Sequence, residues 1–87
     1  MSLDEAARQL KMAVHDAQVS FDCVGLGDLD RAQEHAVTAR TAADAALLAL
    51  TQALQDMSPE EAQAAGERAV AALEESEPPP AGVQERV

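Results

Sequence analysis

Apolar residues recur at alternating spacings of four and three positions over the first part of the chain, and this pattern constrains the fold more than any other feature. The unbroken series is Leu3, Ala7, Leu10, Val14, Ala17, Phe21 and Val24. A period of about 3.5 residues belongs to a helix that packs along one seam, whereas a strand alternates every two residues. The spacing therefore predicts a helix over residues 3–23. Ser2 and Glu5 give its start the spacing of a capping box.

A glycine-containing segment between Val24 and Asp28 predicts a reversal of the chain. Gly25 is expected to take the left-handed conformation that ends many helices, and Asp28 to cap a second helix. A reversal centred near Leu26 predicts an antiparallel hairpin. Its predicted neighbours are Leu3 with Leu50, Leu10 with Ala43, Val14 with Ala39, and Ala17 with Ala36.

The second helix is expected over residues 29–57, where three parallel strips of apolar residues recur. The strips are a first row of Leu29, Ala36, Ala43, Leu50 and Met57, a second row of Ala32, Ala39, Ala46 and Ala53, and a third of Leu47 and Leu54. Small side chains in register allow two helix backbones to approach closely. The alanine row resembles the alanine-coil style of antiparallel packing, which is a packing motif found in unrelated proteins.

A proline restarts the chain after the second helix. Ser58, Pro59 and Glu61 form a second capping box, with the proline at the first helical position. A third helix is expected over residues 59–75, with an apolar side made mostly of alanine. Residues 76–87 contain three consecutive prolines and few apolar residues, so we expect a disordered tail beyond a single helical domain of residues 1–75.

The core that these helices can build is thin. The chain has 87 residues, and Phe21 is its only aromatic residue. Alanine favours helix but removes little apolar area from water. We therefore expect an all-α fold, an antiparallel hairpin plus a shorter third helix, that completes a bundle by self-association. The residues expected to form the helix-packing interface are Leu3, Leu10, Val14, Phe21, Leu29, Ala32, Ala36, Ala39, Ala43, Ala46, Leu47, Leu50, Ala53, Leu54 and Met57.

The net charge of −10, with only six Lys and Arg residues, argues against several classes of partner. Nucleic acids and anionic membranes are bound through positive charge, so neither is expected as a partner. The sequence shows no pattern of a cleavable signal peptide and no apolar run long enough to span a bilayer. A cytoplasmic location is expected, with export by a signal-independent route as an open alternative.

Residues that could carry chemistry do not form a recognisable constellation. His15 and His35 lack the spacing of bundle metal sites, and both are expected at the surface. Cys23 follows Asp22 rather than a positive charge, so an inert, reduced thiol without a disulfide partner is expected. The sequence therefore predicts no enzyme, no metal and no cofactor.

These features favour a small acidic helical protein-interaction module, a homodimeric regulator or adaptor. A sharper version is an acidic inhibitor or antitoxin that covers a basic surface. The chain also resembles the WXG100 class, whose members are short, acidic helical hairpins without a cleavable signal. That resemblance implies a secreted hairpin substrate. Here the turn reads Val24-Gly25-Leu26-Gly27 in place of Trp-x-Gly, and the chain has no tyrosine.

Overall fold

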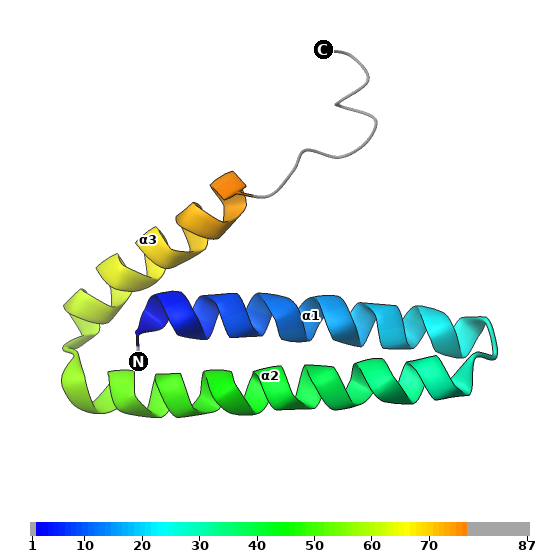
Figure 1. The fold of residues 1–87 in the computed structure, drawn as a ribbon. Helices are drawn as coiled ribbons and strands as arrows, with labels where there is room; N and C mark the ends of the chain where they lie inside the picture. The colour runs from blue at the N-terminus through cyan, green and yellow to red at the C-terminus, as the bar shows by residue number, and fades with distance from the viewer. Residues whose placement is uncertain (1, 77–87) are drawn as a thin grey trace, which may run out of the picture.

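The computed structural model describes residues 2–76, which form three helices (Figure 1). Helix α1 spans Leu3–Gly25, α2 spans Leu29–Asp56 and α3 spans Pro59–Ser76. Helices α1 and α2 pack as an antiparallel hairpin, and α3 is the shortest. The all-α prediction of a hairpin followed by a shorter helix is confirmed. The tail predicted to be disordered lies, from residue 77 onward, outside the described residues.

The turn of the hairpin is closed by a glycine, but not by the one predicted. The N–H of Gly27 donates to the Val24 carbonyl at 3.0 Å, and the N–H of Asp28 donates to the Cys23 carbonyl at 2.9 Å. This pair of bonds is the Schellman arrangement, which requires a left-handed residue at its first donor. Gly27 has φ 75°, whereas Gly25 is the last residue of α1. The expectation for Gly25 is wrong because the helix runs two residues further than predicted.

The seam between α1 and α2 is built from small and polar residues. On α1 the buried and half-buried positions that follow the seam are Ala6, Gln9, Ala13, Asp16, Ser20 and Cys23. On α2 they are Ala32, His35, Ala39, Ala42, Ala46, Ala49 and Ala53. Both sets alternate spacings of three and four, as in an antiparallel coiled coil. The buried core of the described residues consists of alanines and Cys23.

The large apolar strip of α1 is turned away from this seam. Val14 is 69% exposed and Phe21 is 73% exposed, so neither side chain is buried between the two helices, as the predicted seam required. Every member of that strip stands one position after a seam position, which rotates it by about 100° around the helix. The physical reason is that the alanine row of α2 allows close approach only to short side chains.

Two hydrogen bonds cross the seam, one between two polar side chains and one from a side chain to the backbone. Asp16 Oδ1 and His35 Nδ1 lie 3.0 Å apart, with side chains that are 13% and 30% exposed. The Ser20 hydroxyl donates to the Ala32 carbonyl at 2.7 Å. His35 therefore belongs to the seam, and its expected surface position is wrong. Half-buried polar contacts of this kind favour one register of the packed helices.

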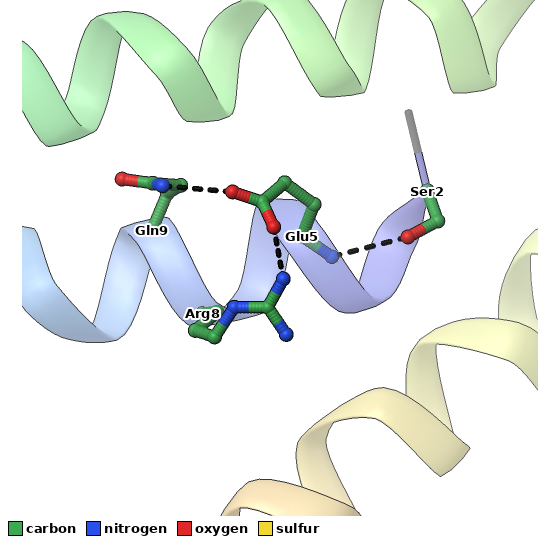
Figure 2. Close-up of polar contacts among 4 residues, drawn as sticks. All are labelled: Ser2, Glu5, Arg8 and Gln9. Carbon is green, nitrogen blue, oxygen red and sulfur yellow. Dashed lines mark hydrogen bonds and ion pairs between the residues drawn. The ribbon is translucent and has the colours of Figure 1, made fainter.

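Serine caps begin α1 and α3. The Ser2 hydroxyl accepts from the Glu5 N–H at 3.2 Å, while the Glu5 carboxylate accepts from Gln9 and Arg8 (Figure 2). Hydrogen bonds from Gln9 and then Arg8 lower the pKa of Glu5. The return bond from the Ser2 N–H that a capping box requires is not among the hydrogen bonds of the described residues.

The predicted capping box at the start of α3 is complete. The Glu61 N–H donates to the Ser58 hydroxyl at 3.1 Å, and the Ser58 N–H donates to the Glu61 carboxylate at 2.8 Å. The backbone bond from Ser58, followed by its side chain, lowers the pKa of Glu61 from its ordinary value of 4.5. The carboxylate therefore stabilises the folded chain in its ionised form.

The lowered pKa of Glu61 predicts a pH-dependent contribution to stability. A folded pKa below the unfolded one gives stability that is present above the unfolded pKa and is lost as pH falls through the folded pKa. The free energy of unfolding of the wild type should exceed that of Glu61→Gln at about pH 6, and this difference should shrink towards about pH 3. Urea titrations at several pH values measure it. The control Glu60→Gln removes a charge from the same turn but keeps the cap, and should show a smaller change. If the difference in the free energy of unfolding between the wild type and Glu61→Gln were constant over this pH range, the lowered pKa of Glu61 in the folded chain would be contradicted.

Helix α3 packs on α1 and makes only slight contact with α2. It begins beside the open end of the hairpin and diverges from α1 towards its C-terminal end (Figure 1). Ala69 is buried, and a Cβ added at Gly66 would lie 4.0 Å from Leu3 Cδ1. The small residues of α3 thus bring it close to the start of α1, while they leave the hairpin largely uncovered.

Candidate interaction surface

Most of the large apolar side chains that the described residues expose lie along one side of the hairpin. Thirteen large hydrophobic residues are exposed in that part of the chain. Eight of them belong to two strips, which we name together the apolar face. Its α1 strip is Leu3, Ala7, Leu10, Val14, Ala17, Phe21 and Val24, and its α2 strip is Leu29, Gln33, Ala36, Arg40, Ala43, Leu47, Leu50, Leu54 and Met57.

Helical geometry places both strips on the same side. Each strip stands one position after the seam of its own helix, a rotation of about 100°. Because the two helices run in opposite directions, this rotation turns both strips towards one side of the hairpin. Leu3 of α1 lines a common groove with Leu50 and Leu54 of α2, as this geometry requires.

The opposite side of the hairpin is polar, and we name it the polar face. Its positions are Glu5, Arg8, Met12, His15, Val19 and Asp22 on α1, and Arg31, Glu34, Thr38, Thr41, Ala45, Leu48, Gln52 and Gln55 on α2. Five of these fourteen residues are charged, and only scattered apolar residues occur among them. The hairpin is therefore a two-sided layer with one side suited to water and one side suited to another protein.

Charge separates the two faces further. The chain carries sixteen acidic residues, yet neither strip of the apolar face contains one. Arg40 is the single charged residue on that face. A surface of this kind loses little solvation of charges when another surface covers it.

Two grooves border the apolar face. The first, of ≈ 600 Å³, lies between the middle of α1 and the diverging α3, with an apolar lining of Ala7, Leu10, Val14, Val70 and Leu73 and a polar lining of Lys11, His15, Gln18 and Glu74. The second, of ≈ 590 Å³, lies at the end of the hairpin opposite the turn, which we name the open end, and is lined by Leu3, Leu50, Ala53, Leu54, Met57, Ser58, Pro59 and Ala62. Both grooves include members of the apolar face, and the second lies at its open end.

The turn end of the hairpin carries exposed apolar side chains. Phe21 and Val24 of α1, Leu26 of the turn and Leu29 of α2 are 73%, 58%, 82% and 66% exposed. The turn lies at the end of the hairpin away from the start of α3 (Figure 1). The chain thus carries an exposed apolar cluster at one end and an apolar groove at the other.

The predicted interface residues divide into two groups in the structure. Ala32 and Ala46 are buried and Ala39 and Ala53 half-buried in the seam of the hairpin. The others lie on the apolar face: Leu3, Leu10, Val14, Phe21, Leu29, Ala36, Ala43, Leu47, Leu50, Leu54 and Met57. Contact of these residues with another molecule stays a prediction.

Sequence reasoning missed most of the seam, including all of its α1 positions. Ala42 and Ala49 are buried in α2, and Ala6 is buried in α1. The α2 signal was available in the sequence. His35, Ala42 and Ala49 fall between Ala32, Ala39, Ala46 and Ala53 and give an unbroken three-and-four series: 32, 35, 39, 42, 46, 49, 53. The histidine in that series hid the pattern.

The residues considered for chemistry do not assemble into a site. Cys23 is a free thiol buried in the seam, and its predicted inertness stays a prediction. His15 is exposed beside the groove between α1 and α3, far along α1 from the turn. Among residues 2–76 no three His, Cys, Asp or Glu side chains are grouped in a way that could hold a metal ion.

Within the described part of the chain, no helix is both long and apolar enough to cross a membrane. Comparison with protein-family models, with curated proteins and with solved structures finds no match to this chain. The class of protein is therefore defined by its own fold and surface: a small, extended helical protein with a concentrated set of exposed hydrophobic residues.

Proposed function

We propose that this chain is a protein-interaction module, a small regulator or adaptor without catalytic activity. Its apolar face is covered by helices of a partner protein. The observation that carries the proposal is the contrast between the two sides of one hairpin. Leu47 and Leu48 are adjacent and similarly exposed, at 62% and 56%, but the apolar face that includes Leu47 carries eight of the thirteen exposed large hydrophobic residues.

Covering this face is energetically favourable. Fully burying one large aliphatic side chain contributes about 1.5–3 kcal/mol. The core of the described residues holds no large side chain that is fully buried, so the hairpin gains little of this energy alone. A helical element needs a second packed layer, and α3 supplies it only near the start of α1.

The spacing of the face indicates the kind of surface that fits. Its α1 strip repeats at four and three positions from Leu3 to Val24 without a break. A strip whose apolar residues recur with this period packs well against a helix whose apolar residues recur with the same period. The side chains of each helix then fit between those of the facing helix. A helical partner surface is therefore expected, in contrast to an extended peptide, which pairs with a strand edge.

Site-specific photo-crosslinking in the native host tests the proposal. A photoreactive amino acid replaces Leu47 in one variant and Leu48 in the other, because these neighbours are matched in exposure but only Leu47 belongs to the apolar face, and Leu48 is rotated from it by about 100° around α2. The Leu47 variant should form discrete covalent protein adducts, and the Leu48 variant should form few. The masses of the adducts show whether the covering protein is a second copy or a different chain.

Two results would overturn the proposal. One is an absence of adducts from position 47 when the protein is folded and irradiated. The other is an equal pattern of adducts from positions 47 and 48, since this would mean that the apolar face is no more engaged than the polar face.

A further inference from the structure

We infer that the occupant of the apolar face is a second copy of this chain, packed with two-fold symmetry so that the turn end of each hairpin lies over the open end of its partner. This inference rests on the proposed function, because it names the partner of the same face. The inference goes beyond the proposed function because it specifies that the partner is a second copy and that its helices run in the reversed orientation.

The size of the face approaches what a stable dimer needs. Its α1 strip runs from Leu3 to Val24, about 32 Å at a rise of 1.5 Å per residue. Two helices at a usual separation of 8–10 Å give the face a width of about 20 Å. The resulting footprint of about 600 Å² approaches the roughly 800 Å² per partner of stable protein interfaces. The side chains of α3 that line the first groove extend it further.

The distribution of charge permits two copies to meet on this face and hinders other arrangements. The chain has a net charge of −10, so two copies repel each other in general. The apolar face is free of acidic residues, whereas the polar face carries Glu5, Asp22 and Glu34. Contact through the apolar face therefore keeps these acidic side chains of both copies on the outer surfaces, while Glu74 borders the contact at the first groove.

The shape of the face is complementary to itself when one copy is reversed. Phe21, Val24, Leu26 and Leu29 are exposed at the turn end, and the groove lined by Leu3, Leu50 and Leu54 lies at the open end. A two-fold axis through the middle of the face places each exposed cluster over the grooved end of the partner. Such an isologous contact closes on itself and forms a dimer, not a filament.

Cysteine cross-linking tests both the partner and its direction. In a Cys23→Ser background, Phe21→Cys and Leu47→Cys are introduced singly and together in the full chain, and the protein is treated with a short bismaleimide. Within one chain these positions lie about 24 Å apart along the hairpin axis, since Ser20 pairs with Ala32 and sixteen residues at 1.5 Å separate residue 31 from 47. A short linker cannot span this distance within the chain. The reversed dimer brings position 21 of one copy near position 47 of the other.

The double variant should give a covalent dimer, and each single variant should remain largely unlinked. Efficient cross-linking of Phe21→Cys alone would place the two turn ends together and would overturn the reversed arrangement. Light scattering on the unmodified wild type at concentrations up to the millimolar range gives the second measurement. A monomer throughout that range would overturn the second copy as the occupant, while adducts from position 47 with a different protein would still support the proposed function.

Discussion

A leucine in place of Ala46 is expected to lower the free energy of unfolding by about 1–3 kcal/mol, because it adds three heavy atoms to a closely packed seam. Ala46 is 0% exposed and belongs to the row of alanines along which α2 meets α1. In a domain of this size each kcal/mol corresponds to about 4–8 °C in melting temperature. Thermal melts of the wild type and of Ala46→Leu measure the loss.

Alanines outside the seam provide matched controls for this substitution. Ala64 and Ala71 are exposed on α3, so the same change there should alter stability by less than about 0.5 kcal/mol. Ala39→Leu, at a half-buried position of the seam, should fall between these and Ala46→Leu. Equal losses at all four positions would show that the alanine row is not the critical contact of the hairpin.

The helices and their connections were predictable because local signals define them. Ser58 and Pro59 mark the start of α3, and Asp28 caps α2 by accepting from the Arg31 N–H at 3.3 Å. Periodicity identified the helices, and the glycine pair identified the reversal. The precise closing residue was missed, since either Gly25 or Gly27 could satisfy the same local requirement and the length of α1 decides between them.

The face that each helix buries was less predictable. The larger apolar strip of α1, with Leu10, Val14 and Phe21, gives the stronger sequence signal, yet α1 buries a neighbouring strip that contains Asp16 and Ser20. Sequence periodicity reports which residues share a side, but not whether that side meets the same chain or a different one. The choice depends on how closely the backbones approach, and the alanines of α2 favour close approach.

Buried polar residues also made the seam difficult to recognise. A histidine and an aspartate at core positions weaken the apolar pattern of both helices, and only their pairing across the hairpin explains them. Asp16 and His35 are nineteen residues apart in sequence, so the pairing is visible only once the register of the hairpin is known. That register follows from the turn, which is why the bond between them was not predicted.

The second large effect that we expect is a dependence of the melting temperature on protein concentration, because the apolar face is exposed in the single chain. If a second copy covers the apolar face, folding and association are coupled, and the melting temperature must depend on protein concentration. With an unfolding enthalpy of about 0.7 kcal/mol per residue, each tenfold increase in concentration should raise the melting temperature of the dimer by about 5 °C. The wild type is expected to show this slope over two or three decades of concentration.

Leu47→Lys and Leu48→Lys separate the effect of the face from the effect of adding a charge. Both residues are exposed in the single chain, so neither substitution removes a contact inside the hairpin. Leu47→Lys introduces a charge that a covering copy must bury, which typically costs several kcal/mol. It should abolish the concentration dependence, whereas Leu48→Lys on the polar face should retain it. A wild-type melting temperature that does not change with concentration would contradict the dimer, and loss of the dependence in both variants would contradict its location on the apolar face.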